Sequence, residues 1–396
     1  MNHNQTTNYS ALLTRLTASI KSNRNIKAGD RVLAAMSGGV DSSVMAALLH
    51  HADLDVVGVS MKLSKKIDDQ PNNNVNSNCC VVNEFDDAHK VACKFGFSHQ
   101  TINFENKFKE TVIEPFIESY ITGNTPSPCI YCNQNIKFGA LLKTATELNC
   151  KFMATGHYAC VTQDSTGYHL MKSKDVTKDQ SYFLFTHNQE TLARTLFPIS
   201  QLSKAEVRQL ARYLEIHIAD KTDSQEICFI SGRYYDYVAK IKQLSTEIGD
   251  IRHINGQILG HHSGYWRFTI GQRKGIGISY SDPLFVVRID PTTNIVWVGY
   301  EKDLLGSELI AKKISWCIKP PINQCFHCCV KIRSRSQEVG AIVCLLENNK
   351  ARVVFDTPQR AIAPGQAVVF YLDNEILGGG WIEKNSCIVP NAFSRT

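Results

Sequence analysis

The stretch that decides the fold reads RVLAAMSGGVDSSVMAALLHH and spans residues 31–51. Residues 31–36 are almost all apolar, which is typical of a strand buried in a parallel sheet. Gly38 and Gly39 follow, and an apolar helix is expected from about residue 42 to 51. A buried strand, a glycine turn and a helix begin a strand–helix–strand unit, which predicts a parallel sheet covered by helices.

The alternation of strands and helices continues along the first half of the chain. The bounds expected from the apolar patterns are strands at 55–61, 98–103 and 151–155, and helices near 85–95, 105–122 and 133–148. The Asn-rich stretch 64–78 predicts a mobile loop. This order of elements indicates a doubly wound α/β domain.

The pattern changes after about residue 225 to short alternating runs separated by turns, such as 295–298, 351–355 and 367–371. The predicted fold class is therefore α/β, with a doubly wound parallel sheet followed by a small central β-rich domain and a C-terminal β-barrel. The expected bounds are a flexible lead-in at 1–29, the α/β domain at 30–225, the central domain at 226–290 and the barrel at 291–396.

Composition excludes several classes of protein. The 396 residues are 43% hydrophobic and 20% charged, as in an ordinary globular protein, and no apolar run is long enough to span a membrane. The net charge of +6 permits a polyanionic partner. Fourteen cysteines in a chain of this length are expected to be mostly reduced thiols. The basic N-terminal stretch before Asp30 is either a frayed, partly helical lead-in or an organellar transit peptide.

The glycine turn has the chemistry of an anion site. In SGGVDSS (37–43), the glycines let the backbone approach an anion, and the helix start adds free N–H groups and a positive dipole end. Ser37, Ser42 and Ser43 add hydroxyl donors, while Asp41 among phosphate-binding groups implies a bridging Mg²⁺. The alternative is a simple helix cap, which needs only one such residue. Neither a Walker A loop nor a Rossmann fingerprint is present in this turn.

The cysteines suggest nucleophilic chemistry. TPSPCIYCN (125–133) holds Cys129 and Cys132 behind two stiffening prolines, and Cys132 is expected near the start of a helix at Asn133, where the helix dipole favours a thiolate. A single C-x-x-C is a redox pair, half of a metal site or a coincidence. The other half of a zinc site would have to come from residues 325–329 (CFHCC). Cys228 taken alone is an ordinary buried apolar residue.

Taken together, these motifs carry a family resemblance. The loop at 37–43 is similar to the signature of the PP-loop ATP pyrophosphatases, which cleave ATP to AMP and pyrophosphate. The other matching stretches, in the same order along the chain, are TPSPCIYCN (125–133), ATGHY (154–158), KDQSYFL (178–184), DSQEICFI (223–230) and TIGQRKGIGI (269–278). Over most of its length the chain therefore resembles the tRNA-specific 2-thiouridylases, the MnmA/TrmU family of PP-loop ATP pyrophosphatases.

The resemblance implies ATP-dependent replacement of the C2 oxygen of the wobble uridine (U34) of tRNA by sulfur. It implies that Cys228 carries a persulfide, and that Cys132 releases the sulfur by forming a Cys132–Cys228 disulfide or as hydrogen sulfide. The implied partners are tRNAs for Lys, Glu and Gln, and a cysteine desulfurase or sulfur-relay carrier, with no membrane. Reduction of the disulfide in each turnover implies the cytoplasm, or an organellar matrix if the N-terminus is a transit peptide.

The resemblance also assigns a site for ATP and Mg²⁺. Its expected ATP-binding residues are Ala35, Met36, Ser37, Gly38, Gly39, Val40, Asp41, Ser42, Met61 and Gly156. Met61 taken alone would be interpreted as core filling. The resemblance thus implies that residues 30–225 form the PP-loop domain and residues 226–290 a tRNA-binding domain.

The residues expected to contact tRNA follow from the same stretches. They are Ser127, Pro128 and Cys129 at the target base, and His157, Lys178, Asp179, Gln180, Arg333, Ser334 and Gln366 elsewhere. Without the family, His157 is equally well a buried structural histidine, and 178–180 an ordinary polar helix entry. Lys331, Arg333 and Arg335 have a period of two, which predicts a phosphate-binding strip on a strand or a solvated strand face.

Cys129 departs from one branch of the family, which has an Asp with an acid/base role at this position. Either Cys129 or water would then take that role. Three thiolates, those of Cys129, Cys132 and Cys228, also permit an iron–sulfur cluster with one open iron. The residues leave these two thiol chemistries open.

Two other functions compete with this hypothesis. A PP-loop ligase or amidotransferase acting on a small molecule would share the ATP loop but would need an ammonia source and would not need Cys132. A non-catalytic RNA-binding or metal-binding protein would need neither the ATP loop nor Cys132. The intact phosphate loop argues against such a protein.

Overall fold

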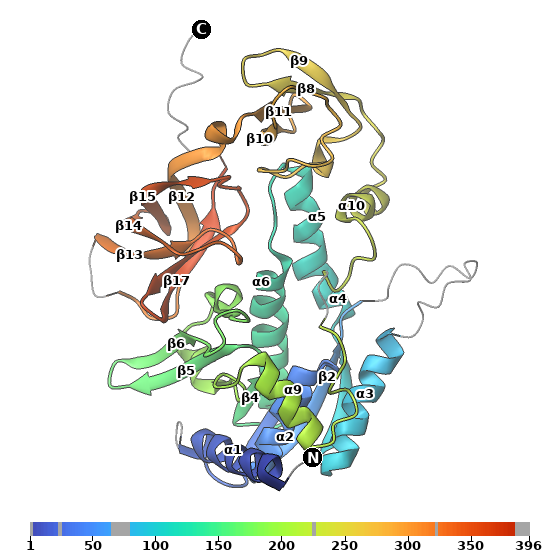
Figure 1. The fold of residues 1–396 in the computed structure, drawn as a ribbon, viewed down its shortest axis with the longest axis vertical. Coiled ribbons are helices and arrows are strands. Elements are labelled where there is room, and N and C mark those ends of the chain that lie inside the picture. Colours follow the sequence, from blue (N-terminus) through green and yellow to red (C-terminus); the bar gives the residue numbers. More distant parts are fainter. Residues whose placement is uncertain (1–2, 23–25, 65–79, 224–226, 321–323, 385–396) are drawn as a thin grey trace, which may run out of the picture. The chain divides into compact units, whose positions relative to one another are not determined.

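The computed structural model describes residues 3–22, 26–64, 80–223, 227–320 and 324–384 (Figure 1). The chain divides into two compact units. The first comprises Met1–Lys109, Tyr131–Phe229 and Asn374–Ile376, and the second comprises Glu110–Ile130, Ile230–Asp373 and Leu377–Thr396. Each unit is described by itself below.

A five-stranded sheet forms the centre of the first unit. Its order is β3-β2-β1-β4-β7, and every neighbouring pair is parallel. The strands are β1 Arg31–Ala35, β2 Asp55–Lys62, β3 Ser98–Asn103, β4 Phe152–Thr155 and β7 Thr195–Leu196. After its first residue β1 is buried throughout, as its unbroken apolar run predicts. The predicted doubly wound α/β fold is confirmed.

Helices cover this sheet. They include α1 His3–Ser22, α2 Val40–His51, α3 Cys80–Phe95, α8 Gln189–Arg194 and α9 Lys204–Tyr213. Leu48 of α2 and Val207 of α9 are fully buried in one core with Leu16 and Ile20 of α1. The lead-in expected to be flexible at 1–29 is therefore a packed helix over the residues described, because its apolar positions are buried. The loop predicted at 64–78 lies almost entirely outside the described residues.

Two long helices each contain a π-helical segment. The first runs through α4 Glu105–Phe108, η1 Lys109–Ile113 and α5 Glu114–Ile121, and the second through α6 Pro128–Cys132, η2 Asn133–Leu141 and α7 Leu142–Glu147. The second helix begins five residues before the predicted start at Asn133. Proline favours the first turn of a helix, since its missing N–H would be unpaired there in any case. Short π segments are frequent at functional sites.

A hairpin and short helical turns complete the first unit. The hairpin joins β5 Ala159–Asp164 to β6 Gly167–Lys172 in antiparallel register, and the 3-10 turn η3 covers Ser181–Leu184. The His169 ring in β6 lies between the carboxylates of Glu375 and Asp164, at 2.6 and 2.9 Å.

The second unit holds the predicted β-rich parts. Helix α10 Tyr234–Lys242 precedes a four-stranded sheet with the order β10-β11-β8-β9. Its elements are β8 Gly249–His253, β9 Ile258–His262, η4 Tyr265–Arg267, β10 Phe285–Asp290 and β11 Ile295–Gly299. Ile251, Val286 and Val296 are fully buried between the strands and the loop that follows η4.

A closed antiparallel barrel of six strands follows, as predicted. Its strand order is β12-β15-β14-β13-β16-β17, and pairing of β12 with β17 closes it. The elements are η5 Glu301–Leu304, β12 Leu305–Trp316, β13 Cys325–Lys331, β14 Val339–Leu346, β15 Lys350–Arg360, β16 Ala367–Leu372 and β17 Glu375–Ile382. Alternate side chains fill the interior, with Val330, Val343, Val353 and Phe370 fully buried.

One pair of cysteines departs from the expectation of reduced thiols. Cys325 and Cys344 lie directly opposite each other on β13 and β14 and form a disulfide. Among the described residues, Cys129, Cys132 and Cys228 are not disulfide-bonded. The sequence did not predict this pair because strand register, which the sequence does not reveal, places the two side chains face to face.

Candidate functional site

The glycine- and serine-rich loop at residues 37–43 lies at the carboxyl edge of the parallel sheet. Strand β1 ends at Ala35, and α2 starts at Val40. The chain continues from β1 to β2 on one side, whereas β4 lies on the other side of β1, so the strand order reverses between β1 and β4. Ligands of open α/β sheets bind at such switch points. Met61 near the end of β2 and Gly156 directly after β4 lie at the same edge.

The loop is shaped as an anion cradle. The backbone N–H of Ser37 donates to Ser42 Oγ at 3.2 Å, and Ser42 Oγ donates to the Gly39 carbonyl at 3.0 Å. The buried Ser43 Oγ has no hydrogen-bond partner among the described residues, although it lies in the first turn of α2. The N-terminus of α2, with its positive dipole end, suits a phosphate.

Gly156 is required by close backbone packing. A Cβ atom at this position would lie 2.8 Å from the backbone nitrogen of Ser42 and 3.0 Å from the carbonyl carbon of Asp41. Only glycine therefore lets the end of β4 approach the start of α2 without displacing one of them. The sequence prediction grouped Gly156 with the loop, and the structure brings the two together.

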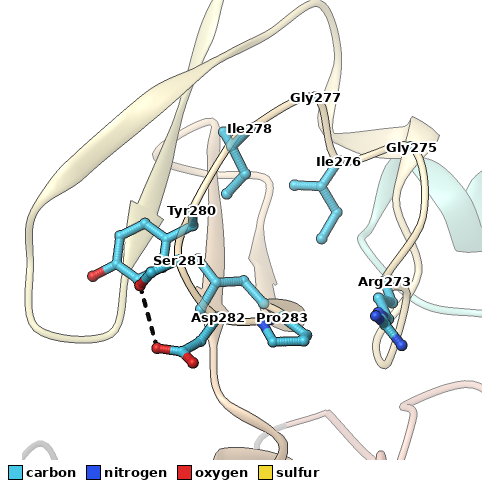
Figure 2. A pocket seen from close by; sticks show the side chains of 10 residues that line it. Arg273, Gly275, Ile276, Gly277, Ile278, Tyr280, Ser281, Asp282 and Pro283 are labelled. Carbon is cyan, nitrogen blue, oxygen red and sulfur yellow. Dashed lines mark hydrogen bonds between the residues drawn. The ribbon is translucent and has the colours of Figure 1, made fainter.

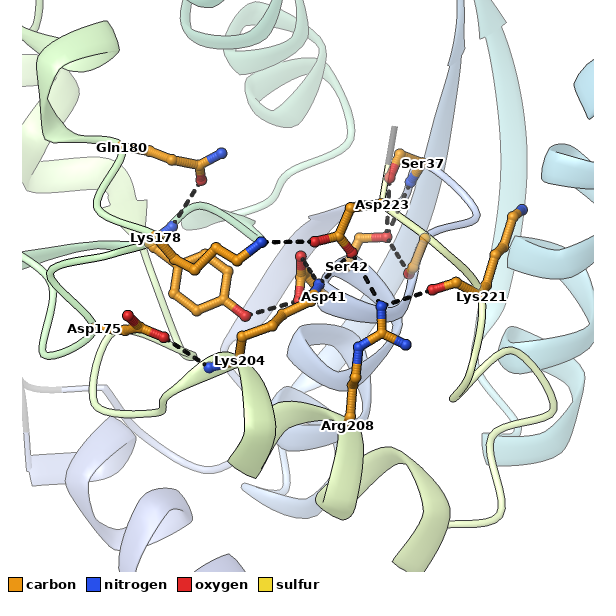
Figure 3. Close-up of polar contacts among 12 residues, drawn as sticks. Ser37, Asp41, Ser42, Asp175, Lys178, Gln180, Lys204, Arg208, Lys221 and Asp223 are labelled. Atoms are coloured by element: carbon orange, nitrogen blue, oxygen red, sulfur yellow. Dashed lines mark hydrogen bonds and ion pairs between the residues drawn. The ribbon is translucent and has the colours of Figure 1, made fainter. Parts of the chain in front are cut away.

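Basic side chains surround the loop (Figure 3). Lys204 at the start of α9 places its Nζ 2.8 Å from both carboxylate oxygens of Asp41 and 2.7 Å from Asp223 Oδ1. Lys221 Nζ donates to the Gly38 carbonyl at 3.0 Å. Lys178 and Arg208 reach Asp223 at 3.0 and 3.4 Å. The site thus combines an anion cradle with a cluster of cations.

Most of this cluster was not predicted from the sequence. Lys204, Arg208 and Lys221 belong to no motif, and more than 160 residues separate Lys204 from Asp41. The only local signal is the capping box at Ser203 and Glu206, which fixes the start of α9 at Lys204. That signal predicts a helix start and says nothing of the loop it faces.

Two acid–base groups in this cluster have shifted pKa values. Burial alone would raise the pKa of Asp223, but hydrogen bonds from Lys204 and Lys178 outweigh it and hold this pKa below its ordinary value. Burial, together with the Asp41 carboxylate that accepts its hydroxyl at 2.9 Å, raises the pKa of Tyr158. Asp223 is therefore charged and Tyr158 neutral at neutral pH.

The expected nucleophiles lie on two segments. Cys129 is exposed in the first turn of α6, and the buried Cys132 ends that helix. Cys132 is therefore a full turn inside a helix rather than at the start of one, which corrects the prediction. The correction follows from the helix beginning at Pro128.

Cys228 is exposed in a turn, and the buried side chain beside it anchors that turn. Phe229 packs edge-to-face on Phe108 of α4, with ring centroids 5.5 Å apart. Helix α4 also packs against η2, which starts directly after Cys132. The Cys228 turn and η2 thus both contact the same short helix.

The described residues do not supply a metal cluster site. Within these parts of the chain, no three or more His, Cys, Asp or Glu side chains are grouped so that they could hold a metal ion. Likewise, no helix in the described ranges is long and apolar enough to cross a membrane.

The expected tRNA residues of the first unit are held by internal hydrogen bonds. His157 is buried, with Nδ1 2.8 Å from Thr155 Oγ1 and Nε2 3.2 Å from Lys137 Nζ. Burial, with the nearby Lys137, holds the pKa of His157 well below its ordinary value. Gln180 Oε1 accepts the backbone N–H of Tyr158 at 2.9 Å, and Asp179 Oδ1 accepts that of Ser173 at 2.9 Å.

In the second unit, Gln366 is placed to shape the loop before α6. Its Nε2 donates to the carbonyls of Thr125 and Pro126, both at 3.0 Å. The backbone N–H of Thr125 donates in turn to the Pro364 carbonyl at 2.8 Å. The loop that leads to the buried Ser127 and to Pro128 is therefore clamped by the turn at 363–366.

The predicted strip of basic residues is wrong. Strand β13 ends at Lys331, so Arg333, Ser334 and Arg335 lie in the turn after it and share no strand face. The Arg333 guanidinium instead donates to the carbonyls of Ala361 and Ile270, at 2.7 and 3.3 Å. It ties the barrel to the loop after η4, a role that its spacing did not reveal.

Three family models match the chain. They are described as a tRNA methyl transferase HUP domain at residues 30–232, a tRNA methyl transferase PRC-barrel domain at 236–300 and an aminomethyltransferase beta-barrel domain at 306–382. The tRNA-specific 2-thiouridylase MnmA of Rickettsia conorii is 44% identical over 366 residues, covering 91% of this chain and 98% of that protein. The chain belongs to the tRNA-specific 2-thiouridylase family.

A second relative of the 2-thiouridylase family agrees. The tRNA-specific 2-thiouridylase MnmA of Geobacter metallireducens is 42% identical over 90% of this chain and 98% of its own length. Among solved structures, the U34-tRNA thiolase NcsA of Methanococcus maripaludis is 18% identical with a TM-score of 0.36, covering 59% of this chain and 73% of that chain. Nothing about this chain follows from so low a TM-score.

Proposed function

We propose that this tRNA sulfurtransferase cleaves ATP between its α and β phosphates at the Ser37–Ser43 loop and adenylates the C2 oxygen of the wobble uridine. The observation that carries the proposal is the 37–43 loop at the N-terminus of α2, where Gly156 lets β4 approach the start of α2 closely. The helix dipole of α2 and the nearby cations favour a polyphosphate there. The adenine would lie by Met61, at the end of β2.

The residues present also fit Mg²⁺. Asp41 and Asp223 would hold the ion, since carboxylates and phosphate oxygens are its preferred ligands. The ion would neutralise charge that develops on the leaving pyrophosphate. In the structure Lys204 neutralises both carboxylates instead, so its ammonium group is expected to turn from Asp41 toward the phosphates when Mg·ATP binds.

Sulfur transfer completes the reaction. The terminal sulfur of a Cys228 persulfide attacks C2 and expels AMP. The Cys132 thiolate then attacks Cys228 Sγ, which breaks the sulfur–sulfur bond, leaves one sulfur on C2 and forms a Cys132–Cys228 disulfide. A dithiol reductant supplies the two electrons that restore both thiols. The turn position of Cys228 and the shared packing on α4 support this pairing.

The remaining assignments are proposals of the same kind. Cys129, exposed in the first turn of α6, would exchange a proton with the reacting base beside Ser127 and Pro128. His157, Lys178, Asp179, Gln180, Arg333, Ser334 and Gln366 would contact tRNA or hold segments that do. The substrates would be tRNAs for Lys, Glu and Gln, the sulfur donor a cysteine desulfurase or relay carrier, and the compartment a reducing one such as the cytoplasm.

Mass spectrometry of tRNA nucleosides tests the proposal. Unmodified tRNA is incubated with the protein, Mg·ATP, a persulfide donor and a dithiol. Formation of 2-thiouridine at position 34 is expected with the unaltered protein and with Cys93→Ser, whose thiol is exposed outside the site. Cys228→Ser and Cys132→Ser are expected to abolish it with a persulfide donor. A methylated uridine, or ATP cleavage without any modified nucleoside, would reject the proposal.

A further inference from the structure

The second unit contains a cavity that the proposed reaction does not use (Figure 2). Its volume is about 330 Å³, and ten of the residues between 273 and 284 line it, with Arg273, Tyr280 and Asp282 among them. Pockets of this size accommodate small ligands. The cavity contains the second half of the TIGQRKGIGI stretch, the one matching motif that has no role in the reaction above.

The cavity wall is a loop with a fixed base. The side chain of Gln272 holds the base by accepting the Thr269 N–H at 3.0 Å and donating to the Lys274 carbonyl at 3.1 Å. Ile276 and Leu284 are buried in the core of the four-stranded sheet. Gly275 and Gly277 on either side of Ile276 have φ values of +75° and +84°, which side chains disfavour. The loop is thus anchored while its polar side chains stay accessible.

The accessible groups match the parts of a nucleotide. Tyr280 is 39% exposed, and its ring lies nearly parallel to that of His253, with centroids 6.1 Å apart and an interplanar angle of 14°. An exposed aromatic ring supported from behind is a platform for a base. Arg273 is an exposed cation that suits a phosphate, and the Asp282 carboxylate can accept N–H groups from a base edge.

Hydrogen bonds connect this loop to the loop before α6. Arg333 binds the Ile270 and Ala361 carbonyls, and the turn at 363–366 that follows Ala361 clamps Thr125 and Pro126. Both loops belong to the second unit. A nucleotide bound at one loop is therefore linked to the other loop through these hydrogen bonds.

We propose that the 273–284 cavity binds one unpaired nucleotide of the tRNA, other than the uridine that is thiolated, with its base on Tyr280 and its phosphate at Arg273. The inference rests on the proposed function, because it takes tRNA as the substrate. A mainly apolar metabolite is disfavoured, since an arginine, an aspartate, a serine and a tyrosine line the cavity.

The test measures the affinity of the full-length protein for unmodified tRNA and its dependence on salt. Tyr280→Ala is expected to weaken binding about tenfold, the usual loss for one stacked base, whereas Tyr280→Phe keeps the ring and stays near the unaltered value. Arg273→Ala is expected to reduce the slope of log affinity against log salt by about 0.7, the value for one contact to a single-stranded phosphate. Lys319→Ala removes an exposed cation of the same unit outside the cavity and is expected to leave the slope unchanged.

The outcomes separate this proposal from the one it rests on. If the unaltered protein forms no 2-thiouridine, the proposed function fails. If it does, while Tyr280→Ala and Tyr280→Phe bind tRNA equally well, the nucleotide cavity is refuted. Unaltered thermal unfolding of the variants, together with the expected losses, supports the cavity. Ultraviolet cross-linking of tRNA to the peptide that contains Tyr280 gives a second readout, and its absence counts against the proposal.

Discussion

Replacing Lys204 by alanine should disturb both the stability and the ATP site. The Lys204 side chain is 12% exposed, and its ammonium group lies within 2.8 Å of the carboxylates of Asp41 and Asp223. Lys204→Ala leaves these two carboxylates beside the phosphate loop without their shared cation. Each carboxylate keeps another partner, since Tyr158 donates to Asp41, and Lys178 pairs with Asp223.

The magnitude follows from these contacts. Removing one partner of a fully buried ion pair costs about 3–5 kcal/mol. Asp41 and Asp223 are 28% and 31% exposed and partly compensated, so the free energy of unfolding should fall by about 2 kcal/mol. Loss of the ammonium group that is expected to turn toward the phosphates should raise the KM for ATP by about tenfold or more, since 1.4 kcal/mol corresponds to tenfold.

The assays are denaturant unfolding and pyrophosphate release at varied ATP. Lys174→Ala is the matched control, because Lys174 is 51% exposed and its ion pair with Glu206, at 3.5 Å, lies at the surface. That change should alter stability by less than about 0.5 kcal/mol. If Lys204→Ala and Lys174→Ala behave alike in both assays, the role assigned to Lys204 is refuted.

Three further changes test other parts of the account. Gly156→Ala puts a Cβ 2.8 Å from the backbone nitrogen of Ser42, so it should destabilise the fold by about 1–3 kcal/mol and weaken ATP binding by calorimetry; unchanged affinity would contradict the close packing. Burial lowers the pKa of His169, but hydrogen bonds, chiefly to Glu375, outweigh it and raise the pKa. The stability that His169 contributes is therefore fully present below its unfolded-state pKa and is lost as pH rises through its folded-state pKa. The difference in unfolding free energy between the unaltered protein and His169→Gln should shrink over that rise. A difference that does not depend on pH would contradict this role of His169. Reducing the Cys325–Cys344 disulfide, which joins residues 19 apart, should lower the free energy of unfolding by about 3 kcal/mol through chain entropy. The unfolding of Cys325→Ser should not change when reductant is added, and an equal change in both proteins would exclude this bond.

The parallel sheet and its phosphate loop could be predicted because the signals are local. An unbroken apolar run, two glycines and a serine-rich helix start specify the β1–α2 unit within about twenty residues. The closed barrel was predicted in the same way, from alternating runs such as 351–355 that became β15.

The parts that were missed depend on long-range placement. Lys204 and Lys221 reach the loop through tertiary packing, so no spacing in the sequence identifies them. The basic strip failed because the chain turns after Lys331, and the Cys325–Cys344 bond depends on strand register. Helix α6 begins at Pro128, before the predicted start at Asn133, because proline suits the first turn of a helix.

The most direct measurement follows the fate of the uridine oxygen. A tRNA that carries a heavy oxygen isotope only at C2 of the wobble uridine is thiolated with unlabelled Mg·ATP in ordinary water, and the products are analysed by mass spectrometry. Adenylation of that oxygen followed by displacement with sulfur predicts that the label appears in AMP, one atom for each 2-thiouridine formed. Unlabelled AMP alongside 2-thiouridine would contradict activation of the C2 oxygen by adenylation.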